Sequence, residues 1–239
     1  MNKSKQVEYY NVYVSRQVAA GINERHHSII KKMLKLGLKK HMHVLEIGCG
    51  IGTVSELLLK HLTNGTLLAL DLSPDSIEVA RQRLKKYKNA EFKAADIIET
   101  DIKAQFNMIM LPDVLEHIPL EQHHDMFIKL KQLLQPDGKI VIHIPNPYHL
   151  DYCRAQGMEM QIIDQGVYLT LLINNLKDTG LFISYLEVYN IWVNEGDYQF
   201  IVLENEEKFT TFTSIIKKNP FYKKLKDKIL YEYKKRFKK

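Results

Sequence analysis

Residues 44–55 read VLEIGCGIGTVS, an apolar run followed by three alternating glycines: Gly48, Gly50 and Gly52. A glycine has no Cβ, so the backbone can turn tightly there and approach a ligand closely. The spacing departs from the dinucleotide pattern G-x-G-x-x-G at Thr53, and no Gly-Lys-Ser/Thr of a phosphate-binding loop is present. We therefore expect an adenosine-type ligand held without a phosphate grip. The acid Glu46, just before the glycines, indicates that this ligand carries positive charge.

Around this loop, short β-forming runs alternate with stretches of helical periodicity, a pattern typical of parallel βαβ units. The strands are expected at 43–48, 66–71, 90–95, 106–111 and 138–144. After these, an insertion from residue 146, a helix over 165–178 and two β-rich runs, 184–193 and 198–204, complete the pattern. The short NEGD link between the last two runs predicts an antiparallel hairpin. The sequence thus predicts an α/β fold with a doubly wound, mostly parallel sheet.

Two further acids stand where predicted strands end. Asp71 closes TLLALD, where a carboxylate can accept both hydroxyls of a ribose. Asp96 closes FKAAD, where a carboxylate can accept from the exocyclic amine of adenine. Beside Asp71, Ser73 and Pro74 form a helix-start signal, as N-cap and first helical residue. Open parallel sheets bind ligands at the carboxyl ends of their strands, so we expect one ligand to lie across these positions.

Charge is unevenly distributed along the 239 residues. The whole chain carries a formal net charge of +6, yet residues 208–239 hold twelve Lys or Arg against two acids, so the rest is net acidic. An apolar stripe at intervals of four predicts a basic amphipathic helix there, made by Phe221, Leu225, Ile229, Tyr233 and Phe237. Two interpretations stay open for this tail: peripheral contact with an anionic membrane, or packing on its own domain or in a homodimer. A cytoplasmic protein with no nucleic-acid partner is expected.

Five stretches, in this order and spacing, resemble the motifs of the class I S-adenosylmethionine-dependent methyltransferases: VLEIGCGIG, LLALDLSPDSIEVAR, FKAADI, FNMIMLPDVLEHIP and LLQPDGKIVIHIPN. The resemblance covers roughly residues 40–205. It implies a Rossmann-like seven-stranded sheet of order 3-2-1-4-5-7-6 with the seventh strand antiparallel, and S-adenosylmethionine as cofactor. The expected units are an N-terminal helical cover (1–40), the methyltransferase core (41–205) and the basic tail (206–239).

The resemblance also implies roles for residues that match the family's motifs. Gly48, Gly50 and Gly52 would lie beside the methionine portion, and Glu46 would support the loop near the positive end of the cofactor. Asp71 would contact the ribose, and Asp96 and Ile97 the adenine. Leu72, next to Asp71, would also bind the cofactor. Leu111, at the end of the fourth strand, would lie near the sulfonium.

Methyl transfer is an in-line displacement at an already activated carbon, so the protein must mainly orient the acceptor and remove its proton. His117, in DVLEHI, is the candidate general base, although a structural role for this Glu-His pair is an open alternative. His143 is expected to be a hydrogen-bonded core residue, and His123 and His124 to be solvated. No metal site is expected, because the histidines do not combine with carboxylates at ligand spacing.

Acceptor contacts are expected from two covers over the strand ends. The N-terminal segment contributes Tyr10, Tyr13 and Arg25, and the segment after the fifth strand contributes Tyr148 and Tyr152. Two alternatives stay open for the N-terminal set: it could grip the carboxylate of the cofactor, or it could serve ordinary helix packing. The predicted function is methylation of a small-molecule acceptor at a hydroxyl of a sugar, a phenol or quinone, or a lipid-linked group. The alternative is a catalytically inactive S-adenosylmethionine-binding domain that acts as a partner or scaffold. LPDV replaces the Asn/Asp-Pro-Pro-aromatic motif used on nucleobase amines, which disfavours a nucleic-acid acceptor.

Overall fold

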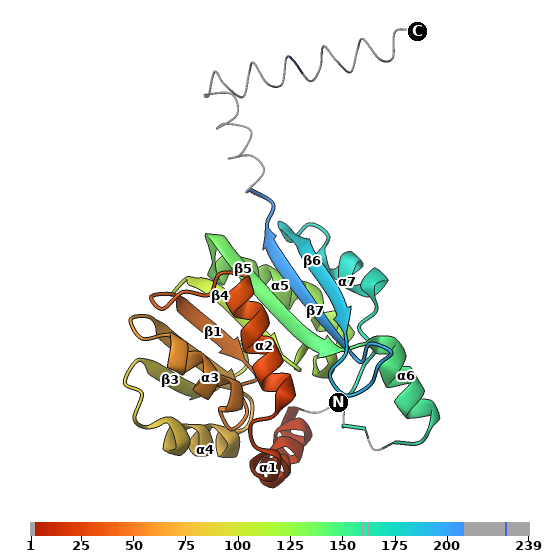
Figure 1. Cartoon of the computed structure of the whole chain (residues 1–239), viewed down its shortest axis with the longest axis horizontal. Helices are drawn as coiled ribbons and strands as arrows, with labels where there is room; N and C mark the ends of the chain where they lie inside the picture. Colours follow the sequence, from red (N-terminus) through yellow and green to blue (C-terminus); the bar gives the residue numbers. More distant parts are fainter. Residues whose placement is uncertain (1–2, 159, 162, 208–227, 229–239) are drawn as a thin grey trace.

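A computed structural model describes residues 3–158, 160–161, 163–207 and 228 (Figure 1). Its central feature is a seven-stranded sheet with the strand order β3-β2-β1-β4-β5-β7-β6. The strands are β1 (His43–Ile47), β2 (Thr66–Asp71), β3 (Ala90–Ala94), β4 (Phe106–Pro112), β5 (Leu134–Pro145), β6 (Leu181–Tyr189) and β7 (Tyr198–Asn205). Strand β7 runs antiparallel to both β5 and β6, and the other pairs are parallel. The predicted fold class and strand order are therefore confirmed.

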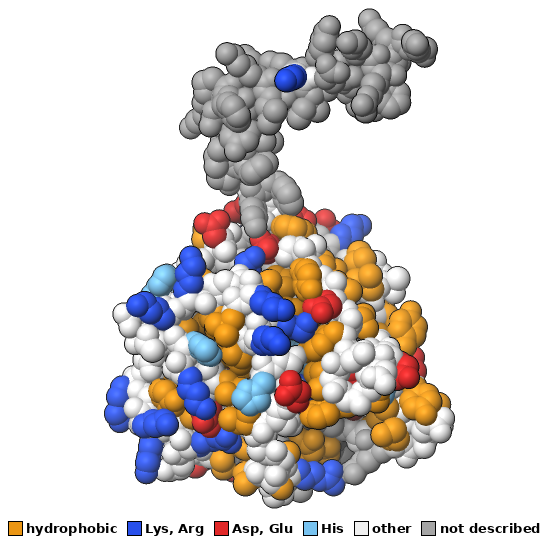
Figure 2. Space-filling model, viewed as in Figure 1, with side chains coloured by type: hydrophobic (Ala, Val, Ile, Leu, Met, Phe, Trp, Pro, Cys, Tyr) orange, Lys and Arg blue, Asp and Glu red, His pale blue; other side chains and the backbone are white. Residues whose placement is uncertain are grey.

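Helices cover both faces of this sheet. The α-helices of the described residues are α1 (Lys3–Ala20), α2 (Glu24–Lys35), α3 (Thr53–His61), α4 (Pro74–Leu84), α5 (His123–Leu133), α6 (Pro147–Ala155) and α7 (Leu169–Leu176). Helices α2, α3 and α4 share one buried cluster with strand side chains, and α5 and α7 share a second. Figure 2 shows the face over α2, where basic side chains gather beside hydrophobic ones.

The two clusters follow from alternation along the strands. In β4, Met108 and Met110 pack in the cluster of α2, α3 and α4, whereas Ile109 and Leu111 pack in the cluster of α5 and α7. Successive side chains of a strand point to opposite faces, so a strand covered by helices on both sides is apolar throughout. The strand ends are then the places where the sheet can present polar groups to a ligand.

The predicted start of α4 is confirmed. Ser73 is the N-cap, its Oγ accepts from the backbone N–H of Ser76 at 3.0 Å, and Pro74 is the first helical residue. The segment after β5 holds a helix where the sequence suggested an insertion. Asn146 caps α6, and Pro147 begins it.

Several predicted bounds differ from the observed ones. Strand β5 begins four residues earlier than predicted, at Leu134, and α7 is shorter than the predicted helix. Strand β6 ends at Tyr189 rather than at 193, because the Asp197 carboxylate accepts from the backbone N–H groups of Ile191 and Trp192 and folds them into the hairpin loop. His123 is fully buried rather than solvated, since its Nε2 contacts the carbonyls of Leu115 and Ile118.

The last strand ends on the side of the sheet away from the carboxyl ends of the parallel strands. Strand β7 is antiparallel, so Asn205 lies at the edge opposite the carboxyl ends of β1, β2 and β4 (Figure 1). The predicted amphipathic helix of the tail falls, apart from Lys228, outside the described residues. Within the part of the chain that is described, no helix combines the length and apolar character needed to cross a bilayer.

Candidate active site

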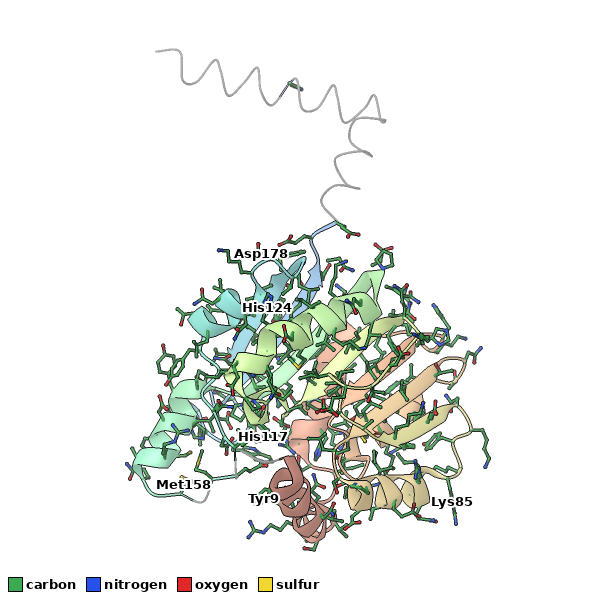
Figure 3. The ribbon with its side chains drawn as sticks, turned by 180° about the vertical axis from the view of Figure 1, so that it is seen from behind. Tyr9, Lys85, His117, His124, Met158 and Asp178 are labelled. Carbon is green, nitrogen blue, oxygen red and sulfur yellow. The ribbon has the colours of Figure 1, made fainter. Side chains whose placement is uncertain are left out.

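A cavity of about 250 Å³ lies at the carboxyl ends of the parallel strands. Its walls come from the loop after β1, the ends of β2, β3 and β4, the N-terminal helices, and the segments around His117 and Gln161. Figure 3, drawn from behind, shows His117 at this edge of the sheet, close to α1. The predicted cofactor residues therefore meet at one place, together with residues from the predicted cover.

The glycine loop adopts a backbone that other residues rarely take. Gly48, Gly50 and Gly52 have φ angles of +74°, +52° and +80°. A Cβ on Gly50 would lie 2.8 Å from Nε2 of Gln17, so α1 closes directly over the loop. Gly52 differs from the prediction: it does not line the cavity, and a Cβ there would meet Leu84 and Ala80 of α4. Gly52 therefore allows close helix packing rather than approach of a ligand.

Asp71 joins the loop to the second strand. Its Oδ2 accepts from the backbone N–H of Gly50 at 2.7 Å, and its Oδ1 accepts from that of Ser73 at 2.9 Å. Burial raises the pKa of Asp71, and the backbone N–H bonds act against that rise. Each carboxylate oxygen has a second acceptor position, so Asp71 can still receive ligand hydroxyls. Leu72 lines the cavity beside it.

Asp96 and Ile97 line the cavity at the end of the third strand. The Asp96 Oδ1 accepts from the backbone N–H of Ile98 at 2.9 Å, which orients the carboxylate. Ile97 is 3% exposed and belongs to the buried cluster of α5 and α7, so it offers a rigid apolar wall to a flat ring. The two residues thus present a carboxylate and an apolar surface to the same part of the cavity.

Glu46 is fully buried beneath the loop and lines the cavity. Its Oε2 accepts from the Ser55 hydroxyl at 2.6 Å, whereas its Oε1 has no hydrogen-bond partner among the described residues. Burial, with a smaller contribution from Asp71, raises the pKa of Glu46 to about 8 although the Ser55 bond opposes the rise. The site thus contains a carboxyl group that is mostly neutral near pH 7 and lacks one partner.

His117 lines the cavity from the short turn after β4 and is 8% exposed. Its Nδ1 lies 2.5 Å from the carbonyl oxygen of Ile163, and a carbonyl only accepts, so Nδ1 carries the proton. Burial lowers the pKa of His117, while the Ile163 carbonyl and Asp164 act in the opposite direction. The neutral ring therefore has its lone pair on Nε2.

Arg25 and Asp113 form an ion pair on the cavity wall, with Nη1 and Oδ2 2.7 Å apart. Asp113 has a φ of +54°, and its Oδ1 lies 3.0 Å from Nδ1 of His143. Burial alone would raise the pKa of Asp113, but Arg25 and His143 outweigh burial and lower the pKa to about 2. His143 is a buried, hydrogen-bonded core residue, as predicted.

Besides Gly52, three predicted site residues do not reach the cavity. Leu111 is fully buried in the core, and Pro112 takes the cavity position, because strand alternation turns Leu111 toward α5. Tyr148 and Tyr152 are 72% and 60% exposed on α6, outside the cavity. Tyr13 does line the cavity, whereas the side chain of Tyr10 lies outside the described residues.

Sequence reasoning missed several lining residues, which are mostly polar: Gln17, Asn23, His26, Gln122 and Gln161. Their spacing carries no motif, and they meet only because α1, the start of α2, the turn before α5 and the segment between α6 and α7 fold toward the same edge. Among the described residues, no group of three or more His, Cys, Asp or Glu side chains is placed to hold a metal ion.

The known proteins that match this chain in sequence are methyltransferases. Residues 45–140 match the family described as "Methyltransferase domain". The ubiquinone biosynthesis O-methyltransferase of Coxiella burnetii is 34% identical over 164 residues, which are 68% of this chain and 65% of that protein. The malonyl-[acyl-carrier protein] O-methyltransferase of Acetivibrio thermocellus is 28% identical over 141 residues, which are 58% of this chain and 46% of that protein. The chain thus spans less than two thirds of these relatives.

Solved structures agree in fold. Magnesium protoporphyrin IX methyltransferase from Synechocystis PCC 6803, solved with bound SAH, has a TM-score of 0.67 at 15% identity, covering 84% of this chain and 98% of that one. The N-methyltransferase NodS from Bradyrhizobium japonicum has a TM-score of 0.60 at 23% identity, covering 76% and 94%. The glycine loop, the strand order and these matches together place the chain in the class I S-adenosylmethionine-dependent methyltransferase family.

Proposed function

We propose that the protein binds S-adenosylmethionine in this cavity and transfers its methyl group to an oxygen of a small-molecule acceptor. The observation that carries the proposal is a set of buried polar atoms without partners on residues that line the cavity: Oε1 of Gln17, Nε of Arg25 and Oε1 of Glu46. An unsatisfied buried polar group costs about 1–3 kcal/mol. Several around one cavity are therefore expected to find partners when a polar ligand is bound.

The residues present fit this cofactor. Asp71 offers acceptor positions for ribose hydroxyls, Asp96 and Ile97 offer a carboxylate and an apolar wall for adenine, and Glu46 offers an acidic group for a cationic amino-acid end. When bound, the cofactor supplies the activated methyl carbon. The chain's own residues orient the two reactants and exclude water, since α1 covers the loop through Gln17.

His117 is the residue that fits proton removal. Its Nδ1–H is committed to the Ile163 carbonyl, and burial lowers its pKa, so the ring is neutral near pH 7 with the lone pair on Nε2. A neutral imidazole beside the acceptor side of the cavity can take the proton of a hydroxyl as the oxygen attacks. Asp113 is a poor base by comparison, because Arg25 and His143 occupy both of its oxygens and lower its pKa.

We propose an oxygen acceptor for the same reason. The Asp113 carboxylate, which lines the cavity near His117, is already paired on both oxygens and is not open to a cationic amine acceptor. The acceptor classes that fit a polar cavity with a neutral base are a sugar, a phenol or quinone, and a lipid-linked hydroxyl. The two relatives named above as O-methyltransferases are in line with this choice.

The first test is binding of S-adenosylhomocysteine by calorimetry to the wild type and to Gly50→Val. The valine side chain would collide with Gln17 over the loop, so binding should be lost. Gly157→Val is the matched control: its φ is +68°, so its backbone strain is similar, but no atom lies within 4 Å of its Cβ position. Unchanged binding in Gly50→Val, or no binding in the wild type, would contradict the proposal.

The second test is transfer of a labelled methyl group from S-adenosylmethionine to a panel of sugars, phenols and lipid-linked hydroxyls. Release of S-adenosylhomocysteine with a methylated acceptor supports catalysis. Tight cofactor binding without turnover on any member would instead favour a binding domain that serves as a partner or scaffold.

A further inference from the structure

The segment between α6 and α7 closes over the turn that carries His117. The His117 Nδ1 lies 2.5 Å from the carbonyl oxygen of Ile163. The backbone N–H of Gln165 donates to the carbonyl of Glu116 at 3.0 Å, and its side-chain Nε2 donates to the carbonyl of Ile118 at 2.9 Å. These hydrogen bonds fix the orientation of the His117 ring relative to a segment that is almost fifty positions away in the sequence.

Asp164 lies between the residues that make these contacts. Its Oδ1 is 3.9 Å from Nδ1 of His117, and its side chain is 12% exposed. Its Oδ2 accepts from the backbone N–H of Gln161 at 3.1 Å; Gln161 lines the cavity, whereas Asp164 does not. The carboxylate is therefore held on the Nδ1 side of the ring and does not contact a ligand in the cavity.

Helix α6 holds the backbone of Asp164 in place. Nη2 of Arg154 donates to the Asp164 carbonyl at 2.8 Å, and Nη1 donates to Oδ1 of Asp151 at 2.8 Å. The other oxygen of Asp151 accepts from the hydroxyl of Tyr168, the N-cap of α7. The segment with Asp164 is thus fixed to both helices that flank it.

Four groups act on the charge of His117: Asp113, Arg25, Glu116 and Asp164. Asp113 and Arg25 form an ion pair and act on the pKa of His117 in opposite directions. Glu116 has its Oε1 3.9 Å from Nε2 of His117, but burial raises the pKa of Glu116 well above its ordinary value, so it is neutral near pH 7. Among the described residues, the Asp164 carboxylate forms an ion pair with His117 alone. It is therefore the uncompensated negative charge beside the ring.

We propose that Asp164 is a positioning residue for His117, which it orients from the Nδ1 side and stabilises as an imidazolium during methyl transfer. The inference rests on the proposed function, in which Nε2 removes the proton of the acceptor hydroxyl. The acceptor oxygen bonds to the methyl carbon while its proton moves to Nε2, and the electron pair of the breaking carbon–sulfur bond stays on sulfur. The ring is then a cation beside Asp164 until water takes the proton.

The first test follows the protonation of His117 by NMR in the full chain, where its signal is the one lost in His117→Gln. Removal of an opposite charge 3.9 Å from the ring disfavours the charged form. Asp164→Asn should therefore lower the midpoint of the His117 titration by about one pH unit. An unchanged or raised midpoint overturns the inference. A wild-type ring that stays neutral at every pH at which the chain is folded overturns it as well.

Two further variants separate the charge at residue 164 from other effects. Asp164→Glu keeps the charge, so its midpoint should lie nearer to the wild type than that of Asp164→Asn. Asp178→Asn is the matched control, because Asp178 is exposed and lies at the opposite end of the sheet from His117 (Figure 3). Its midpoint should equal that of the wild type, since solvent screens a distant exposed charge. Equal shifts in Asp178→Asn and Asp164→Asn would refute a specific role of Asp164.

The second test is the pH profile of methyl transfer to an acceptor found in the panel described above. Asp164→Asn should lower kcat about tenfold or more at pH 7, while KM for the acceptor stays within about twofold because Asp164 does not line the cavity. The acidic limb of the kcat profile should move to lower pH together with the NMR midpoint, which a merely structural role would not produce. Asp164→Glu should recover part of kcat. An unchanged kcat in Asp164→Asn contradicts the inference.

Failure of the proposed function can be told apart from failure of the role of Asp164. If the wild type methylates no member of the panel, the proposed function fails, whatever the NMR titration shows. If the wild type methylates an acceptor but Asp164→Asn has the wild-type midpoint and kcat, only the role of Asp164 is wrong.

Discussion

Glu46 gives a prediction about stability that needs no acceptor and no cofactor. The carboxyl is fully buried, and its pKa is about 8 in the folded chain, against about 4.3 in an unfolded one. Between these values the folded state holds one more proton than the unfolded state. The free energy of unfolding therefore falls by about 1.4 kcal/mol for each unit of rising pH. The contribution is fully present below pH 4 and is lost as pH rises through 8.

The measurement is urea unfolding of the wild type and Glu46→Gln at pH 6.0 and pH 7.5. Over this interval of 1.5 pH units, the free energy of unfolding should fall by about 2 kcal/mol more for the wild type than for the variant. The reason is that glutamine has nearly the same shape as glutamate but does not titrate. Other titrating groups affect both proteins equally and cancel in the comparison. Glu121→Gln is the control, since Glu121 is exposed, and it should follow the wild type. Equal pH slopes for the wild type and Glu46→Gln would refute the reasoning.

The same carboxyl should couple to the proposed cofactor. An ammonium group placed beside Glu46 favours its ionised form, so binding of S-adenosylhomocysteine should release a proton. Its affinity for the wild type should then rise with pH between 6.0 and 7.5, by up to about tenfold per unit. Calorimetry should show a much smaller rise for Glu46→Gln. A wild-type affinity that is flat or falls over this interval would place the cationic end elsewhere.

The remaining predictions concern the ribose contact, the base and the tail. Asp71→Ala should weaken binding of S-adenosylhomocysteine by about 2 kcal/mol, roughly 30-fold, by calorimetry; unchanged affinity would contradict the ribose assignment. His117→Ala should lower methyl transfer by about 100-fold while affinity for S-adenosylhomocysteine stays nearly intact, and turnover within a few-fold of wild type would leave catalysis to orientation. If residues 219–239 contact anionic lipid, a chain ending at Lys218 should co-sediment less than the full chain with anionic vesicles at low salt; equal binding of both removes the membrane interpretation.

The cofactor side of the site could be predicted because it depends on local sequence. Glycines after a strand and an acid at a strand end lie at the carboxyl edge of any parallel sheet, whatever the distant contacts are. Gly50, Asp71 and Asp96 therefore meet in the cavity as expected. The predictions fail where a residue's role depends on whether its side chain, or the site of a missing Cβ, faces the cavity or a neighbouring helix. Gly52 turns toward α4, and Leu111 turns into the core, because a shift of one residue along a loop or strand exchanges cavity for packing.

The wall formed by Arg25 and Asp113 could not be predicted in the same way, because contacts distant in sequence assemble it. Arg25 was identifiable as a candidate, yet its meaning depends on Asp113, 88 positions later, and on His143 behind it. Neither the sequence around Arg25 nor that around Asp113 shows that both carboxylate oxygens of Asp113 are paired, one with Arg25 and one with His143. This pairing removes Asp113 as a base and leaves the guanidinium with unsatisfied donors. The resemblance therefore implies the cofactor chemistry, whereas the contacts of Arg25 depend on how the N-terminal helices fold onto the ends of β4 and β5.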